Sequence, residues 1–582
     1  MNIYKKTIAS FIFIAILLSG SKSFSQAPPY ISSIDKTSGT VGETVIITGT
    51  NFSTNSADLS VKFGAADATI VSSTANLLEV TVPAGATLNL ISVTKISSQL
   101  TAYANELFSI SFKGQSNVLS SFANLVTFPT GTATYDLCLC DFDGNGLSDV
   151  AITNSESNEV FVYKNTSTPT TTNFTKVTDA DLNIGFRSIN TTCGDLDGDG
   201  KSDLIVTQGG SNNNGIFVFK NVSTGIGIFG FTRIGANLAA PDLTLKNKSD
   251  GNIRTARRVE INDLDLDGKP EIILTTESDH VLDVFKNTSN GSTLSFNSTP
   301  IQIELPDGII TSGLDVKDLN NDGLPEIAVV HDKASDIYII PNNSEPGSLV
   351  FAENIRISVS GSFQNLKIGD INKDGFNDIV ATDRLTNKIV VLENTTSAVG
   401  ATVSMALKTT ITSGINLPWG LDLGDLDGDG TIDIATSSLS GSNIVQILAG
   451  NSSADFTFFD VVNKNATANS RNIKIGDLNG DGKPDLAFTH KVNSGGNGQL
   501  GIFINRNCML PEITPTGDTE ICTGQNLNLE ATQSGGATYT WDQDSNKDGV
   551  FNNLAVKSST DNFLDATVTG SGKYRVTVTD GL

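Results

Sequence analysis

The stretch GDLDGDGKSDL, residues 194–204, places the carboxylates of Asp195, Asp197, Asp199 and Asp203 within nine positions. Nearly the same string occurs seven times, at intervals of 52 to 68 residues, beginning at Asp141, Asp195, Asp263, Asp318, Asp370, Asp425 and Asp477. Every copy has an oxygen-bearing side chain at positions one, three, five and nine, and glycine at position six. Repetition at a near-constant interval predicts an architecture of repeated structural units.

The spacing predicts a calcium site in each copy. Alternate side chains of a tight loop can converge on one ion, glycine permits the turn, and position seven offers its carbonyl oxygen. Calcium takes six to eight oxygen ligands, and the strings contain no histidine or cysteine for a transition metal. The alternative is that Asp, Asn and Gly merely form turns. A turn alone would not offset the repulsion between the acids, which is on the order of 1 kcal/mol for two carboxylates about 4 Å apart in water.

We therefore expect about seven Ca²⁺ ions. The predicted ligands are Asp141, Asp143, Asn145, Leu147, Asp149, Asp195, Asp197, Asp199, Lys201, Asp203, Asp263, Asp265, Asp267, Lys269, Glu271, Asp318, Asn320, Asp322, Leu324, Glu326, Asp370, Asn372, Asp374, Phe376, Asp378, Asp425, Asp427, Asp429, Thr431, Asp433, Asp477, Asn479, Asp481, Lys483 and Asp485. Position seven binds through its backbone carbonyl.

The strings are not helix–loop–helix calcium hands, because position twelve never holds the glutamate that such a hand needs. Each string runs instead into an apolar, β-branched stretch such as DLIVT or EIILT, which predicts a strand. Four strands per repeat, repeated seven times, predict a seven-bladed β-propeller over residues 115–507. The segment 116–128 reads as a fourth strand that completes the last blade and removes an open sheet edge.

These strings resemble the FG-GAP (VCBS-type) repeats of integrin α-subunit propellers and of many secreted bacterial proteins. The resemblance implies that the calcium loops join the first and second strands on the lower face, that the ions are structural, and that ligands meet the upper face. It places at the upper face the residues that follow each second strand or lie about six before each loop. Loop ends are commonly polar, so these residues are candidates for a binding surface only. The candidates are Tyr135, Arg257, His331, Asp383, Trp419, Arg471 and His490.

Two further modules flank the repeats. Residues 28–112 carry alternating apolar strands and resemble the IPT/TIG domain, an immunoglobulin-like sandwich that we expect to act as a spacer. Residues 508–582 look like an immunoglobulin-like, PKD-like module that stops before it is complete. The fold class is therefore all-β, a seven-bladed β-propeller between two immunoglobulin-like sandwiches. Of five cysteines, Cys508 and Cys522 can pair, whereas Cys138, Cys140 and Cys193 read as buried thiols.

Residues 1–25 read as a signal peptide, with two lysines, the apolar run 8–18 and small residues near Ser25. That run is too short to span a bilayer, so we expect no transmembrane span. A net charge of −25 makes nucleic acid an unlikely partner. These features indicate a secreted protein, or one at a bacterial cell surface.

Three functions fit the sequence. The first is a calcium-stabilised adhesion or binding protein whose upper face recognises an extracellular glycan or a surface protein. The second is a carbohydrate-active enzyme resembling a polysaccharide lyase, which would rest on His331 or His490. In the third, the propeller is a stalk element in a larger surface assembly. We favour the first and expect no enzymatic activity, since GxSxG and HExxH strings are absent.

Overall fold

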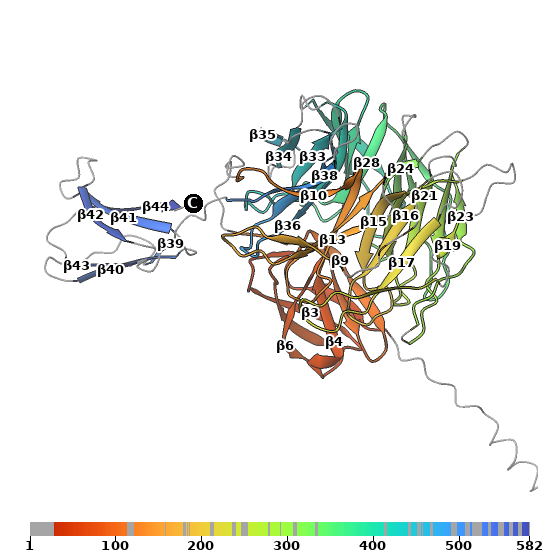
Figure 1. Ribbon diagram of the computed structural model, residues 1–582, viewed down its shortest axis with the longest axis horizontal. Coiled ribbons are helices and arrows are strands. Elements are labelled where there is room, and N and C mark those ends of the chain that lie inside the picture. The colour runs from red at the N-terminus through yellow and green to blue at the C-terminus, as the bar shows by residue number, and fades with distance from the viewer. Residues whose placement is uncertain are drawn as a thin grey trace, which may run out of the picture.

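The computed structural model describes residues 28–112, residues 122–506 with short gaps, and six strands between residues 512 and 580 (Figure 1). The gaps before residue 507 are 157–158, 179–181, 183, 185–186, 210–214, 236–239, 246–253, 277–279, 292, 307–310, 332–335, 413–415, 440–443, 451–455, 457, 466–468 and 491–496. The described residues form strands and one 3-10 turn, η1 (Ser56–Asp58), which confirms the predicted all-β class. Among them, no helix is long and apolar enough to cross a membrane. The predicted signal peptide lies outside this part of the chain.

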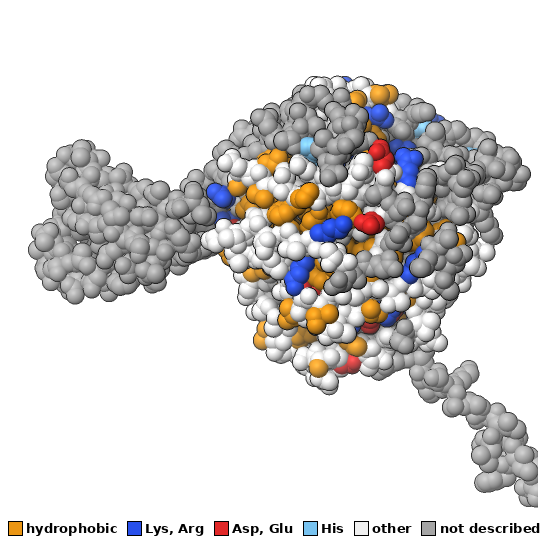
Figure 2. Space-filling view, viewed as in Figure 1, with side chains coloured by type: hydrophobic (Ala, Val, Ile, Leu, Met, Phe, Trp, Pro, Cys, Tyr) orange, Lys and Arg blue, Asp and Glu red, His pale blue; other side chains and the backbone are white. Residues whose placement is uncertain are grey.

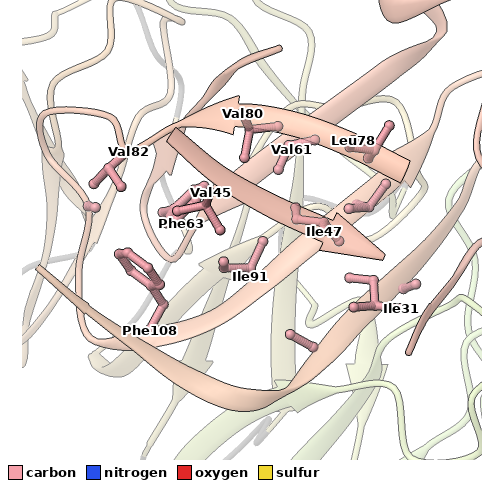
Figure 3. Close-up of a cluster of buried hydrophobic side chains, with 14 of the residues drawn as sticks. Ile31, Val45, Ile47, Val61, Phe63, Leu78, Val80, Val82, Ile91 and Phe108 are labelled. Carbon is pink, nitrogen blue, oxygen red and sulfur yellow. The ribbon is translucent and has the colours of Figure 1, made fainter. Parts of the chain in front are cut away.

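The N-terminal domain is a sandwich of two sheets. In one sheet the strand order is β1-β3-β7-β6, and in the other β2-β9-β8-β4-β5. The strands are β1 (Tyr30–Ile34), β2 (Ser38–Gly39), β3 (Thr44–Thr50), β4 (Leu59–Phe63), β5 (Ala66–Asp67), β6 (Thr69–Ser73), β7 (Leu77–Thr81), β8 (Asn89–Lys95) and β9 (Leu100–Ile110). Side chains alternate across a strand, so Val45 and Ile47 of β3 point inward and meet Ile91 and Phe108 of the facing sheet (Figure 3).

The acidic repeats form a β-propeller of seven antiparallel sheets, which we call blades 1 to 7. Blades 1 to 3 contain β11 (Thr134–Cys140), β12 (Asp149–Asn154), β13 (Phe161–Asn165) and β14 (Phe174–Lys176); β15 (Ser188–Gly194), β16 (Asp203–Gln208), β17 (Gly215–Asn221), β18 (Phe231–Arg233) and β19 (Leu243–Thr244); and β20 (Ala256–Asn262), β21 (Glu271–Thr276), β22 (Val281–Phe285) and β23 (Ile301–Glu304).

In blades 4 to 6, as in blades 1 to 3, the strands follow one another in chain order from the inner to the outer strand. They contain β24 (Thr311–Lys317), β25 (Glu326–His331), β26 (Asp336–Ile340) and β27 (Ile355–Ser358); β28 (Phe363–Gly369), β29 (Asp378–Asp383), β30 (Lys388–Asn394) and β31 (Met405–Ile411); and β32 (Pro418–Gly424), β33 (Asp433–Ser438), β34 (Ile444–Gly450) and β35 (Phe458–Asn465). Blade 7 contains β36 (Ser470–Gly476), β37 (Asp485–His490), β38 (Asn497–Phe503) and, as its outer strand, β10 (Val126–Thr132).

The second strand of each blade is buried along its whole length, because both of its faces pack against a neighbouring blade. In β16, Leu204 and Val206 join a core with residues of blade 1, whereas Ile205 between them joins a core with residues of blade 3. A strand that is buried on both faces needs apolar residues at successive positions. This requirement explains why these segments read as continuous apolar runs.

The blades close into a ring. Each inner strand contacts the next, from β11 through β15, β20, β24, β28 and β32 to β36, and β36 contacts β11 again. The strand β10, which precedes the first repeat, pairs antiparallel with β38 of the last, with Val126 opposite Ile502. This is the predicted closing strand, although it runs over 126–132 rather than 116–128.

The six strands beyond the propeller form two three-stranded sheets. They are β39 (Glu512–Thr514), β40 (Asn526–Thr532), β41 (Ala537–Asp544), β42 (Asn552–Lys557), β43 (Phe563–Thr567) and β44 (Lys573–Asp580). An immunoglobulin-like identity for this segment stays a prediction. The suggested Cys508–Cys522 pair lies outside the described residues.

The prediction that Cys140 and Cys193 are thiols is wrong, because they form a disulfide. Cys140 ends β11 and Cys193 lies in β15, so the bond joins the inner strands of blades 1 and 2. Adjacent inner strands run side by side in a propeller, which brings together residues that lie 53 positions apart. Cys138 is free and buried, as predicted.

Replacing both Cys140 and Cys193 with serine should lower the free energy of unfolding by about 2–4 kcal/mol, because a bridge across a loop of this length restricts the unfolded chain. Urea unfolding of the oxidised protein and the double variant measures the difference. Cys138→Ser is the control. Equal unfolding midpoints for wild type and double variant would contradict a structural role for the bridge.

Candidate metal centres

Each acidic string forms the loop between the first and second strands of its blade. In blade 2, β15 ends at Gly194, the loop follows, and β16 begins with Asp203 at position nine. The glycine at position six has a φ between +82° and +92° in all seven loops, a conformation that side chains with a Cβ rarely adopt. The glycine was predicted to permit this sharp turn.

The same hydrogen bonds fold all seven loops. The carboxylate at position one accepts a hydrogen bond from the backbone N–H of the glycine at position six, at 2.7–2.9 Å. The carboxylate at position nine accepts from the N–H at position two, at 2.7–3.0 Å. Both acids are therefore held in place by the backbone of the loop.

The position-nine acid is fully buried in every blade, and in most blades its second oxygen also has a backbone donor. That donor is the N–H at the end of the third strand, at 2.7–2.8 Å in blades 1, 2, 5, 6 and 7. Charge-assisted hydrogen bonds of this kind hold a carboxylate in one orientation. The position-nine acid is thus a fixed part of the loop.

Several carboxylate oxygens of the loops are buried without a hydrogen-bond donor. They include Asp197 Oδ1, Asp265 Oδ1 and Glu326 Oε1. In four loops, three carboxylates can bring one oxygen each within 4.8 Å of one another. The groups are Asp141, Asp143 and Asp149; Asp195, Asp197 and Asp199; Asp263, Asp265 and Glu271; and Asp425, Asp427 and Asp429. Lys164, Lys220 and Lys286 pair with acids of the first three groups. Buried, convergent oxygens, several of them without a donor, fit a cation, so these clusters can bind a metal ion.

The remaining three loops have asparagine at position three. Asn320 and Asn372 donate their side-chain N–H to the aspartate at position five, at 3.0 and 2.9 Å, and keep their amide oxygens on the loop. Amide oxygens are also calcium ligands, so the substitution lowers the negative charge of a site without removing its ligands.

Burial raises the pKa of the acids at positions one and nine of the loops, and neighbouring carboxylates raise it further. The pKa is about 6 for Asp141 and Asp477, about 7 for Asp195 and Asp425, and about 8 for Asp263. The cause is the same in each case, because a negative charge taken out of water beside like charges costs free energy. A divalent ion among these oxygens would reverse that cost.

Family comparisons agree with this geometry. An IPT/TIG domain model matches residues 29–128, and an FG-GAP-like repeat model matches residues 141–206, 263–329, 318–381, 370–436 and 425–488, about half of the chain. The chain belongs to the FG-GAP-like repeat family. No curated protein matches the sequence.

Several solved structures are similar at low identity. An auxiliary nutrient binding protein from Bacteroides ovatus is 14% identical, with a TM-score of 0.31 over 71% of this chain and 99% of that one. One from Bacteroides thetaiotaomicron is 12% identical, with a TM-score of 0.32 over 83% and 99%. A protein from Lactobacillus plantarum is 9% identical, with a TM-score of 0.41 over 71% and 98%. These similarities are too low to bear on function.

In six of the seven blades, an asparagine at the end of the third strand links the blade to the loop of the preceding one, a role that sequence reasoning missed. The side-chain N–H of Asn221 in blade 2 donates to the carbonyl of Phe142, position two of the first loop, at 2.9 Å. Five others donate to the equivalent carbonyl at 2.7–2.9 Å, namely Asn165, Asn287, Asn342, Asn394 and Asn505. The recurring asparagine after strings such as FVFK and VVLE was the available signal.

The IPT/TIG domain packs directly onto the acidic loops of the FG-GAP-like repeats, where a spacer was expected. The N–H of Asp141 donates to the carbonyl of Ala65 at 3.0 Å, and the N–H of Thr101 donates to the carbonyl of Gly268 at 2.9 Å. Gly198 lies so close to Gln99 that a Cβ would sit 2.3 Å from its backbone. In Figure 1 this domain, labelled β3, β4 and β6, lies against one side of the propeller.

One side chain of the IPT/TIG domain reaches a loop carboxylate, since Thr94 Oγ1 donates to Asp195 Oδ2 at 3.3 Å. The buried Lys62 ammonium pairs with Asp67 Oδ2 of its own domain at 2.9 Å, and its charge offsets part of the rise in the pKa of Asp141 and Asp195. Burial lowers the pKa of Lys62, but Asp67, Asp195 and Asp141 offset it, so this pKa lies above its usual value. Lys62 therefore supplies part of the positive charge that two neighbouring loops require.

The upper-face candidates are less accessible than predicted. Trp419 is 8% exposed, and Arg257, His331, Asp383 and His490 are also buried. His331, Asp383 and His490 are the last residues of second strands, and these strands are covered along their whole length. Asp383 accepts hydrogen bonds from the N–H groups of Ser362 and Thr386, so it supports a turn. The structure does bring Tyr135, Trp419 and Arg471 together, with the Arg471 guanidinium over both rings.

Without calcium, the free energy of unfolding should fall as the pH rises from about 5 to about 8. The folded pKa values of about 6 to 8 lie above the value of about 4 in an unfolded chain, so the folded protein keeps protons that the unfolded chain has lost. With calcium the loops bind as carboxylates, so the gain in Tm on adding calcium should increase over this range. Thermal melts at several pH values in about 2 mM calcium or EDTA test this. A gain that does not change with pH would contradict it.

Lys62→Met should destabilise the protein more in EDTA than in calcium, because bound calcium would supply the charge that Lys62 provides. We expect a loss of about 2 kcal/mol in EDTA, below the roughly 3–5 kcal/mol of a fully buried pair, since Asp67 is 37% exposed. Lys36→Met, which removes a more exposed lysine of the same domain, is the control. The same loss in both buffers would show that Lys62 does not share the charge of the loops.

Proposed function

We propose that this chain is an extracellular binding protein whose FG-GAP-like propeller is stabilised by about seven calcium ions. The observation that carries the proposal is the set of buried, unpaired carboxylate oxygens in loops of one repeated geometry. All-oxygen donors and a position-seven carbonyl favour calcium over a transition metal. The disulfide between Cys140 and Cys193 supports an oxidising location outside the cytosol.

The position of the acidic loops supports a structural rather than a catalytic role for the ions. Each loop lies between strands of its own blade, its position-two carbonyl is bound by the next blade in six cases, and the IPT/TIG domain covers loops of blades 1, 2 and 3. An ion in any of these loops would hold a blade hairpin, and in blades 1, 2 and 3 the IPT/TIG domain would screen it from a substrate. Ligand recognition is therefore assigned to the opposite, upper end of the propeller.

The burial of His331 and His490 favours binding over polysaccharide cleavage. They are 1% and 2% exposed, and burial lowers the pKa of His490. A lyase needs a base that can reach its substrate.

On the face shown in Figure 2, the described charged side chains of both signs are scattered among uncharged ones, without the extended basic stripe of a nucleic-acid surface.

Addition of about 2 mM calcium to the metal-free protein should raise Tm, and about seven ions should bind. A site with a Kd of about 0.2 mM contributes about 1.4 kcal/mol at this concentration. Ion counting by mass spectrometry and thermal melts measure these effects. Asp203→Asn, which removes one charge from the loop of blade 2, should lower the count by one. No ions bound and an unchanged Tm would overturn the calcium proposal.

Binding to a broad array of glycans and surface proteins should occur in calcium and weaken in EDTA. The expected reason is that the loops order the inner strands, whose opposite ends form the upper surface. An array without any calcium-dependent ligand would remove the support for a recognition role. Release of unsaturated sugars from an acidic polysaccharide would support the lyase alternative instead.

A further inference from the structure

A lysine stands at the end of the third strand in three of the seven blades. Lys164 of β13 and Lys220 of β17 precede the last residue of their strands, and Lys286 comes directly after β22. Each is followed by the asparagine that binds the loop of the preceding blade. The corresponding residues of blades 4 to 7 are Pro341, Glu393, Ala449 and Ile504. The lysine is therefore a feature of blades 1, 2 and 3 and not of the repeat as such.

The lysine of blade 3 enters the acidic loop of its own blade. The Lys286 ammonium pairs with Asp265. It also lies 2.8 Å from Asp267 Oδ2 and 3.5 Å from Glu271 Oε1. These acids stand at positions three, five and nine, so the ammonium contacts three of the calcium ligands predicted for this loop. Only 14% of the Lys286 side chain is exposed, which places the charge inside the loop.

Blades 1 and 2 repeat this contact with fewer acids. The Lys220 ammonium pairs with Asp197 and lies 3.1 Å from Asp199 Oδ2, at positions three and five of the second loop. The Lys164 ammonium lies 3.4 Å from Asp143 Oδ2, at position three of the first loop. In all three blades, the lysine therefore contacts the position-three acid, which is buried.

These loops keep oxygens that the lysines do not satisfy. Asp197 Oδ1 and Asp265 Oδ1 are buried and have no hydrogen-bond partner among the described residues. Asp197 is 2% exposed and Asp265 is fully buried. The loops of blades 2 and 3 hold four acids each, whereas the third-strand lysine brings one positive charge. A divalent ion would balance more of the negative charge and would also use the remaining oxygens.

We propose that Lys164, Lys220 and Lys286 compete with calcium for the loops of blades 1, 2 and 3. This inference rests on the calcium proposal above and concerns the affinity of its sites. An ion bound to a position-three oxygen lies about 2.3–2.6 Å from it, which is close enough to the ammonium for strong repulsion. Calcium binding therefore requires the lysine to withdraw, which its flexible four-carbon stem permits. Each lysine lowers the calcium affinity of its loop.

The three loops with a lysine also contact the IPT/TIG domain. The contacts are made by the N–H of Asp141, the carboxylate of Asp195 and the carbonyl of Gly268. A positive charge that belongs to the chain keeps these loops partly neutralised when calcium is scarce. The packing of the domain on blades 1, 2 and 3 then does not depend on calcium alone.

The test measures calcium binding to the full chain by equilibrium dialysis, over about 0.01–10 mM calcium. Methionine replaces lysine because it keeps an apolar stem and removes the ammonium. Lys220→Met should move the binding of one ion to about tenfold lower free calcium, since one like charge near the ion is enough for a change of this size. The triple variant, in which Lys164, Lys220 and Lys286 are all methionine, should move three ions.

The matched control is Lys176→Met. Lys176 belongs to the outer strand of blade 1, where its ammonium lies 3.7 Å from Glu159 Oε2. The variant removes the same charge from the propeller without touching an acidic loop, so its binding isotherm should equal that of the wild type.

Thermal melts give a second readout, because each lysine affects stability in opposite directions with and without calcium. In EDTA, Lys220→Met should lower Tm, since the loop loses the counter-charge that the chain supplies. In about 2 mM calcium the gain in Tm should exceed that of the wild type, since an ion that binds the folded state more tightly stabilises it more. A lower Tm in EDTA without a larger gain in calcium would show that the lysine only stabilises the loop and does not compete.

Glu393→Lys tests the competition without removing a lysine. Glu393 holds the corresponding position of blade 5, where it is half-buried and pairs with Lys408 at 3.1 Å. The new ammonium should move one ion to about tenfold higher free calcium. Glu393→Gln, which removes the negative charge without adding a positive one, is its control and should have a much smaller effect.

The proposal is overturned if Lys220→Met and the triple variant bind calcium as the wild type does or more weakly, if Lys176→Met has the same effect as Lys220→Met, or if Glu393→Lys acts no differently from Glu393→Gln. In each case the ions still bind, so the calcium proposal stands. A wild type and a triple variant that both bind no calcium would overturn the two proposals together.

Discussion

The fold depends on a negative charge buried at the start of each second strand. The acid at position nine is fully buried in all seven blades, and its carboxylate is hydrogen-bonded to the loop and, in most blades, to the third strand. It therefore sets the geometry of the blade hairpin at a buried position, where an unpaired charge costs the most free energy. The other acids of the loop add to that free-energy cost. In the FG-GAP-like repeat, the pairing of the first two strands therefore depends on a positive charge that balances the acids. This dependence explains why the acids recur with the strands.

Groups of like charge converge at both ends of the propeller, negative at the lower end and positive at the upper end. At the lower end, carboxylates converge, and Lys62 of the IPT/TIG domain supplies some of the missing positive charge. At the upper end, guanidinium groups converge around Trp419. Between these ends, Lys367 lies 3.8 Å from Glu260 and 3.7 Å from Asp315, beside a cavity of about 220 Å³ that the IPT/TIG domain covers. The lysine in the channel is thus close to two acids of the inner strands.

Much of the fold could be predicted from the sequence, because its signals are local. Loop spacing, the apolar run after each loop and the strand before the first repeat depend on residues close together in the chain. The Cys140–Cys193 bond could not be predicted, since it joins the inner strands of neighbouring blades and so depends on how the blades pack. The packing of the IPT/TIG domain against the propeller could not be predicted from the sequence either, because it uses backbone groups such as the Ala65 carbonyl and a close approach at Gly198. For the upper face, sequence position selected Tyr135, Trp419 and Arg471, which the structure brings together, but it did not predict the burial of Trp419.

Pairing of β10 with β38 has a consequence for the order in which the chain can fold. Nearly all of the repeat region lies between these two strands, so their contact is among the most distant in sequence. Hairpins within a blade can form as soon as they are synthesised, whereas this contact must wait until the last repeat has emerged. Until then the edge of β38 and the unpaired β10 are open to pairing with other chains. Completion of the circle is therefore a late event, and it covers the open edge of the last blade.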